Sequence, residues 1–346
     1  MNWSSIEQAP QTFNWYDLDA MIALAQKRGV DLLFTLGRTP RWASANPDAR
    51  SPTGPGQCAP PAKIQYWEEF LRAVATHAAG KIKFWETWNE PQNPEFYCGD
   101  ISTMVELQRT AYSIIKSIDP HAMILTPSPV NQAGPRWMSR FLDGGGGNYA
   151  DIASFHGYLD PNSEAESIIE IIAKFKAVFA AHRQDNKPIW DTEAGWGLNS
   201  QLPNQDHQAA FLAKFYLLHW SAGIERFYWY AYDNSEWGTL WDDRNGLRKA
   251  GQAYGQVYDW LRGATMTAPC ALVQSVWKCA FAHENGSQSL VVWTSGKDLD
   301  ISVRTLSSNT FRGYRDLDGN SHKVIGGQVP ISASPIVLEP ETASVH

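Results

Sequence analysis

Helix-like and strand-like hydrophobic patterns alternate along most of the chain. Apolar residues recur at helical spacing in 17–26 and in 64–78, and a glycine, a common helix terminator, closes each stretch. Short apolar runs, typical of buried strands, separate such stretches. We expect strands near residues 30–36, 82–90, 123–126, 152–156, 187–193 and 227–232, and further helices near 102–118, 137–142, 164–179, 208–221 and 254–261.

Helices between short apolar strands predict a parallel sheet with right-handed crossovers, and this many units favour a closed (β/α)8 TIM barrel. The strand count falls short of eight. With only a strand stub near residues 1–5, the first βα unit is unaccounted for. Either the chain is truncated or another segment fills the gap. We favour truncation, because an open barrel would expose two sheet edges.

The pattern changes from about Ala264. Short β-rich runs at 280–283, 290–294, 301–305 and 335–338 are separated by Gly, Asn and Asp turns. We therefore predict a barrel domain over 1–263 and a small, β-sandwich-like antiparallel domain over 264–346. The second is too short to bury much core alone, so it is expected to pack against the barrel.

Composition narrows the range of partners. The net charge of -7 over 346 residues is spread along the chain without basic clusters, which gives no reason to expect nucleic acid or an anionic membrane as partner. No apolar run reaches the roughly 18 residues of a membrane span, and the N-terminus lacks a secretory signal, so any signal has already been removed. The 16 Trp residues suit the apolar faces of sugar rings, although core packing can use them as well.

The four cysteines allow two interpretations. They form no CxxC pair and have no His at ligand spacing, so we expect no zinc. Cys270 and Cys279 are placed as a hairpin would bridge them, and Cys58 and Cys98 fall in loops after two neighbouring strands. Four buried thiols are one alternative. Two disulfides are favoured, and they would place the protein in an extracellular or periplasmic compartment.

Two predicted strands end in a carboxylate. The apolar run from Phe84 stops at Asn89-Glu90-Pro91, and a proline cannot donate to a strand ladder. The segment 188–196 repeats the design, with an apolar entry, Glu193 at its exit and Gly195 just beyond. Because the carboxyl ends of barrel strands form one rim where barrel chemistry sits, paired carboxylates there point to cleavage of a glycosidic bond.

These two motifs resemble a known group of enzymes. Trp88-Asn89-Glu90-Pro91 is similar to the acid/base motif that ends strand 4 in clan A retaining glycoside hydrolases, and Thr192-Glu193-Ala194-Gly195-Trp196 resembles their strand-7 nucleophile. Within the clan, the resemblance is to family 39, which includes β-xylosidases, α-L-iduronidases and endo-acting polysaccharide hydrolases. It is carried by residues 3–7, 13–15 and 39–43. The resemblance covers roughly 3–262. It departs from the pattern at its start, where the first strand and an expected arginine are absent.

The resemblance implies a double displacement on an oligo- or polysaccharide. Glu193 would attack the anomeric carbon and Glu90 would protonate the leaving oxygen, with the carboxyls about 5–5.5 Å apart. No cofactor and no metal are expected; metal-dependent hydrolysis on a barrel would be sensitive to chelators. The alternative is a carbohydrate-binding protein on the same barrel, catalytically disabled by the missing first unit.

Further candidates surround the two carboxylates, each with a structural alternative. Asn89 could bind a sugar 2-hydroxyl or cap its loop, and His156 ends a strand where family members carry a rim histidine. Tyr158 could reach Glu193 or the sugar. Trp229 could form the floor of the reacting subsite or belong to the barrel core. Weaker sugar platforms, chosen because their loops lie near the rim, are Trp42, Trp196 and Trp237. The buried Glu86 and Asp191 are expected to be structural.

Overall fold

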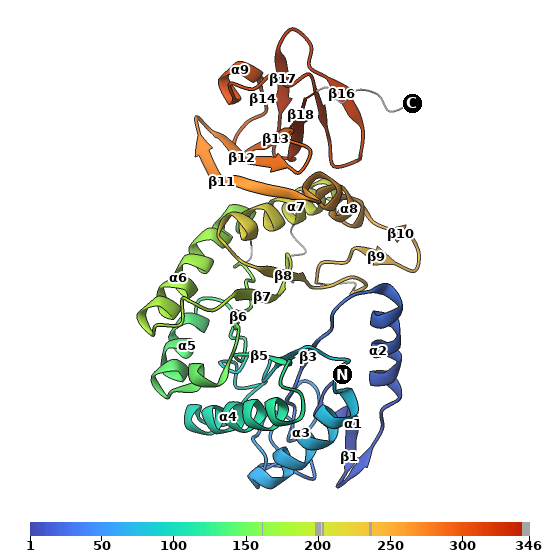
Figure 1. Ribbon diagram of the computed structural model, residues 1–346, viewed down its shortest axis with the longest axis vertical. Helices are drawn as coiled ribbons and strands as arrows, with labels where there is room; N and C mark the ends of the chain where they lie inside the picture. The colour runs from blue at the N-terminus through green and yellow to red at the C-terminus, as the bar shows by residue number, and fades with distance from the viewer. Residues whose placement is uncertain (161, 198–201, 203, 235–236, 341–346) are drawn as a thin grey trace. The chain divides into compact units, whose positions relative to one another are not determined.

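The computed structural model describes residues 1–160, 162–197, 202, 204–234 and 237–340. The chain divides into two compact units. One comprises residues 1–156 and 174–192, and the other comprises 157–173 and 193–346. Figure 1 shows the order of the elements along the chain.

The first unit alternates helices with short strands. Its elements are α1 (Trp3–Ile6), β1 (Glu7–Ala9), β2 (Thr12–Phe13), α2 (Tyr16–Arg28), β3 (Leu33–Thr35), α3 (Ile64–Ala78), β4 (Phe84–Glu86), α4 (Ile101–Ile118), β5 (Met123–Leu125), α5 (Gly134–Asp143), the 3-10 helix η1 (Gly146–Tyr149) and β6 (Ala153–Phe155). Two further elements, α6 (Ile168–Ala181) and β7 (Ile189–Ala194), cross the boundary between the units.

Parallel strands follow one another in chain order. Leu33 of β3 pairs with Phe84 of β4, which pairs in parallel with Met123 of β5. Parallel bridges continue the series to β6, which pairs in parallel with β7. A helix covers each crossover, so the predicted α/β alternation is confirmed. Closure into an eight-stranded barrel and the missing first unit stay predictions.

The helices form where the sequence places apolar stripes. In α3, the side chains of Trp67, Phe70, Leu71 and Val74 are fully buried on one face. Helix α2 ends at Gly29, whose left-handed backbone (φ 65°) lets its N–H bond the last turn of the helix. Each helix thus covers its strand through a face that hydrophobic periodicity had located.

Two predicted strand segments are helical instead. The stub near residues 1–5 is α1, because the Asn2 side chain accepts from the Ser5 N–H and the Ser5 hydroxyl accepts from the Asn2 N–H, which caps the turn. The run at 301–305 leaves its strand early. Strand β14 (Leu299–Ser302) gives way to α9 (Val303–Leu306), whose Val303 and Leu306 turn inward to the core.

The second unit contains further helices and strands. They are η2 (Ala165–Ser167), α7 (Gln205–Ser221), β8 (Arg226–Trp229), β9 (Trp241–Asp242), β10 (Gly246–Leu247), α8 (Lys249–Leu261), β11 (Ala264–Val273), β12 (Val276–His283), β13 (Gln288–Thr294), β14, α9, β15 (Gly313–Arg315), β16 (Ser321–Lys323), β17 (Gln328–Ile331) and β18 (Ile336–Glu339). An antiparallel sheet runs in the order β11-β12-β13-β18-β15-β16, and β14 pairs with β17.

The C-terminal strands pack against helices of the same unit. The Cys270 N–H of β11 donates to the Ser221 hydroxyl of α7 at 2.7 Å, and Trp220 contacts Phe281. In the same unit, the Glu166 carboxylate accepts from the Trp293 indole at 2.7 Å and pairs with the buried Lys214 at 3.2 Å. A buried carboxylate needs such partners.

Both proposed cysteine pairs are disulfides. Cys58 is bonded to Cys98 across 40 residues, and Cys270 to Cys279 across 9, between β11 and β12. The first bond joins the loop after β3 to the loop after β4. The second ties the first hairpin of the C-terminal sheet.

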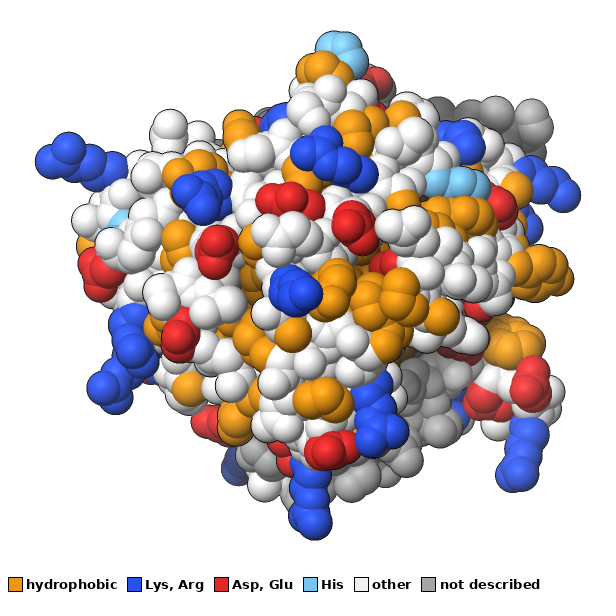
Figure 2. Space-filling view, turned by 90° about the horizontal axis from the view of Figure 1, so that it is seen from below, with side chains coloured by type: hydrophobic (Ala, Val, Ile, Leu, Met, Phe, Trp, Pro, Cys, Tyr) orange, Lys and Arg blue, Asp and Glu red, His pale blue; other side chains and the backbone are white. Residues whose placement is uncertain are grey.

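Charged side chains of both signs are mixed on the surface. On the face shown in Figure 2, Lys and Arg side chains are interspersed with Asp and Glu. Within the described ranges, no helix is both long enough and apolar enough to cross a membrane.

Candidate active site

A buried carboxylate links the ends of several strands below the predicted site. Glu86, the last residue of β4, accepts from the hydroxyls of Thr35 at 2.8 Å and Thr192 at 2.7 Å, and from that of Ser128 in a short hydrogen bond. These hydroxyls come from the ends of β3 and β7 and from the segment after β5. Glu86 therefore has the structural role expected of it.

The hydroxyl partners of Glu86 were not predicted from the sequence. Thr192 and Ser128 are both buried, and they also contact each other at 2.9 Å. Their signal is the one that identified Glu90, a polar side chain at the end of an apolar run. The prediction considered only carboxylates at such positions and therefore did not include these hydroxyls.

Glu90 lies just beyond the regular part of β4. Its N–H donates to the Ser128 carbonyl at 3.0 Å, and its own carbonyl accepts from the Asn93 N–H at 3.0 Å. Its φ of 44° lies in the left-handed region, which is unusual for a residue with a side chain. The chain thus turns sharply at Glu90.

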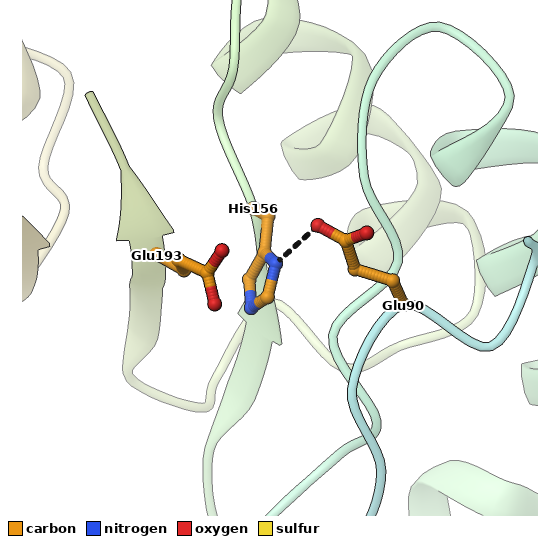
Figure 3. A group of neighbouring side chains, drawn as sticks. All are labelled: Glu90, His156 and Glu193. Atoms are coloured by element: carbon orange, nitrogen blue, oxygen red, sulfur yellow. Dashed lines mark hydrogen bonds and ion pairs between the residues drawn. The ribbon is translucent and has the colours of Figure 1, made fainter. Parts of the chain in front are cut away.

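His156 holds the Glu90 carboxylate. Its Nδ1 lies 3.0 Å from Glu90 Oε1, drawn as a dashed line in Figure 3. The imidazole is 1% exposed, and the His156 N–H donates to the Pro129 carbonyl, which fixes the end of β6.

Glu193 is the second-last residue of strand β7, directly after the Thr192 that binds Glu86. Tyr158 donates its hydroxyl hydrogen to Glu193 Oε1 at 3.1 Å. The Tyr158 side chain is buried, and its ring meets the Trp237 ring edge-on at 5.6 Å. Tyr158 therefore reaches Glu193, which was one of its two predicted contacts.

The loops after β7 and β8 lie in close contact. Tyr230 donates its N–H to the Ala194 carbonyl at 2.8 Å. A Cβ on Gly195 would lie 2.3 Å from the Tyr230 carbonyl oxygen and 2.8 Å from that of Trp237. Only glycine fits between these backbones, so Gly195 sets how closely the two loops approach beside Glu193.

The predicted aromatic platforms differ in exposure. Trp196 is buried at 8% exposure, its ring 5.3 Å from that of Trp229, whereas Trp229 and Trp237 are half-buried. The Trp229 indole donates to the Gly238 carbonyl at 2.7 Å. Half-buried rings can still present a face to a sugar, which a buried ring does less well.

Trp42 and Asn89 lie in the first unit. The Trp42 indole donates to the Glu7 carbonyl at 3.1 Å, and its ring packs edge-on against Tyr66. The Asn89 backbone pairs with Ser128, while its half-buried amide makes no hydrogen bond within the described part of the chain. That amide is available to a ligand.

Strict strand alternation would put Trp88 on the same side as Glu86 and Glu90. The Trp88 ring lies elsewhere. Its ring packs against Trp67 of α3 and Tyr97, and its indole donates to the Phe96 carbonyl. Regular strand geometry ends at Glu86, so period-2 alternation no longer holds beyond that residue.

Near Trp42, burial raises the pKa of the Glu7 carboxyl above its ordinary value. Hydrogen bonds from the Trp3 indole and the Gln11 N–H oppose this effect only in part. The Glu7 side chain thus lies buried beneath the Trp3–Trp42 aromatic contact.

Several solved structures share this fold. A family 39 glycoside hydrolase from Bacteroides cellulosilyticus is 21% identical, with a TM-score of 0.81 over 99% of this chain and 74% of that one. A monomeric beta-xylosidase from Caulobacter crescentus is 16% identical, with a TM-score of 0.69 over 98% of this chain and 87% of that one. A family 30 xylanase from Clostridium acetobutylicum is 14% identical, with a TM-score of 0.66 over 94% and 83%.

No curated protein matches the sequence. The model of the glycosyl hydrolase catalytic core, in contrast, matches residues 62–254, a span of more than half the chain that contains Glu90, His156 and Glu193. The chain therefore belongs to the glycosyl hydrolase catalytic core family.

Proposed function

We propose that this protein is a retaining glycoside hydrolase of the family 39 type, acting on an oligo- or polysaccharide, with Glu90 as acid/base and Glu193 as nucleophile. This assignment rests on the position of each carboxylate at the C-terminal end of its strand and on a neighbouring side chain that contacts it, His156 for Glu90 and Tyr158 for Glu193. The motif resemblance and the likeness in fold to a family 39 enzyme support the same assignment.

The first step forms a covalent glycosyl-enzyme. A Glu193 oxygen attacks the anomeric carbon as the bond to the leaving oxygen breaks, and the Glu90 carboxyl gives its proton to that oxygen. Tyr158 orients the Glu193 carboxylate by binding Oε1 at 3.1 Å. Asn89, with its amide available, is placed to bind a sugar hydroxyl beside the reacting carbon.

The second step releases the sugar. Glu90, now a carboxylate, takes a proton from water, whose oxygen attacks the anomeric carbon from the face that the leaving group vacated. The ester bond to Glu193 breaks, and the carboxylate is restored. Two inversions give net retention, and Glu90 is again protonated.

Variants with small side chains assign the two roles. On aryl glycosides, Glu90→Gln and Glu193→Gln should each lower kcat about 10²- to 10⁴-fold. Azide should rescue Glu193→Ala with a glycosyl azide of inverted configuration, and Glu90→Ala with one of retained configuration. Full activity in either Gln variant, or the opposite pair of configurations, would refute the assignment.

Labelling distinguishes the enzyme from a binding protein. A 2-deoxy-2-fluoroglycoside with a good leaving group should label Glu193, as peptide mass spectrometry would show. Sugar binding without label or turnover would favour the catalytically disabled alternative instead. A panel of aryl glycosides, with bacterial and plant polysaccharides, would identify the sugar.

We also propose that the protein works outside the cytoplasm, and that residues 1–263 form the catalytic domain and 264–346 an accessory domain. Two disulfides with every cysteine paired support the location, since such bonds persist in oxidising compartments.

A further inference from the structure

Two aromatic rings beyond β8, one exposed and one half-buried, have no part in the proposed chemistry. Tyr232 is 58% exposed, and Trp241, on β9, is half-buried. Their rings are parallel within 3°, with centroids 6.3 Å apart. Parallel rings at that spacing overlap little, so much of each face stays uncovered.

The backbone around this ring pair is fixed. The Tyr232 carbonyl accepts from the N–H groups of Leu240 and Trp241, both at 2.9 Å. In the hairpin that follows, Asp242 accepts from the Asn245 N–H at 2.7 Å and pairs with Arg248 at 3.0 Å. The rings are therefore held in place before any ligand binds, which lowers the entropy that binding would cost.

The ring pair continues from the Glu193 site within the same unit. Tyr230, bonded to Ala194 next to Glu193, is 37% exposed, and Tyr232 follows two residues later. Two residues of chain reach at most about 7 Å. The ring pair thus lies close enough to the nucleophile for one substrate chain to touch both.

We propose that Tyr232 and Trp241 form a stacking platform for a sugar unit other than the one cleaved at Glu193. This inference rests on the proposed function and deepens it, because a second subsite selects a chain of several sugars over a simple glycoside. The uncovered ring faces suit the apolar face of a pyranose. The exposed Asp233 carboxylate beside them can accept from sugar hydroxyls.

Affinity electrophoresis tests the platform without turnover. Glu193→Gln would be run in native gels containing soluble xylan, mixed-linkage β-glucan, arabinan or galactan. At least one polysaccharide should retard it, and adding Tyr232→Ala or Trp241→Ala should raise the apparent Kd about 5- to 10-fold. Tyr232→Phe, which keeps the ring, should bind like its parent.

Tyr258→Ala on α8 is the matched control, because Tyr258 is 59% exposed, like Tyr232, but lies outside the ring pair. It should leave retardation unchanged. Thermal unfolding would check that each variant folds, and Trp241→Phe would replace Trp241→Ala if the latter does not. Equal retardation of the Ala variants and the parent would overturn the platform, as would no retardation in any gel.

Failure of the platform differs from failure of the proposed function. If wild-type protein cleaves aryl glycosides while the Ala variants bind polysaccharide normally, only the platform is wrong. If the Ala variants lose binding while wild type cleaves no glycoside, the platform stands and catalysis is refuted.

Discussion

Glu90, the proposed acid/base, has an unfavourable backbone conformation. A left-handed φ costs a residue with a Cβ about 1–2 kcal/mol, and glycine avoids that cost. Glu90→Ala should lose the His156 hydrogen bond and keep the strain, whereas Glu90→Gly should lose both. We therefore expect the Gly variant to be more stable by about 1 kcal/mol in urea unfolding. A more stable Ala variant would mean that this backbone is not strained in solution.

Tyr158 makes a second prediction at the scale of one residue. Tyr158→Phe removes the hydroxyl that donates to Glu193 and leaves the ring against Trp237. Hydrogen bonds to charged groups contribute about 1.5–3 kcal/mol, so kcat/KM on an aryl glycoside should fall about 10- to 100-fold. Unchanged activity would show that Glu193 does not depend on this donor.

Two glycines in α8 give opposite predictions for the same substitution. A Cβ on Gly255 would meet no atom within 4 Å, whereas one on Gly251 would lie 2.5 Å from the Leu240 carbonyl oxygen. Gly255→Ala should stabilise by about 1 kcal/mol through helix propensity. Gly251→Ala should destabilise by about 1–3 kcal/mol through overpacking. Denaturant unfolding of both variants tests the packing of this helix, and equal shifts would contradict it.

The cap of α4 predicts a pH dependence. Asp100 accepts from the Thr103 N–H at 2.7 Å and the Ser102 hydroxyl at 2.8 Å, and these bonds lower its pKa. Because the folded pKa lies below the unfolded one, the stabilisation is complete above about pH 4 and is lost as pH falls through the folded pKa. Asp100→Ala should cost about 1 kcal/mol at pH 7 and less at pH 3. A constant difference would argue against an ionised cap.

Elements were predictable where local pattern and tertiary packing agree. The apolar stripe of α3 and Gly29 at the end of α2 place these helices nearly to the residue. Prediction failed where a single side chain decides whether a segment forms a helix or a strand. Asn2 caps a helical turn in a segment that reads as a strand, and Val303 starts a turn that buries Leu306. Such choices depend on contacts that periodicity does not encode.

At the scale of the whole molecule, the sequence predicted the strand-end carboxylates better than the exposure of the tryptophans. A carboxylate that ends an apolar strand, such as Glu90, has few structural explanations. A tryptophan in a loop, such as Trp196, has many, and its burial depends on how distant loops pack. The exposed Tyr232 and Trp241 had no signal beyond composition, since parallel rings meet only through the fold of the β8–α8 loop.

The two disulfides lead to a prediction about the stability of the whole molecule. The Cys58–Cys98 bond closes 40 residues and the Cys270–Cys279 bond closes 9, so loop-closure entropy assigns about 4 and 3 kcal/mol to them. Replacing both cysteines of the first pair with serine should therefore lower the free energy of unfolding more than the same change in the second.

The two bonds should also differ in their effect on catalysis. Only the first ties the loop that follows Glu90. The Cys98 N–H adds to this connection by donating to the Cys58 carbonyl at 2.8 Å. Loss of that bond should lower kcat/KM on aryl glycosides, measured well below the melting temperature, while loss of the second leaves it unchanged. Equal losses of activity would mean that the first disulfide acts on global stability and does not position the Glu90 loop.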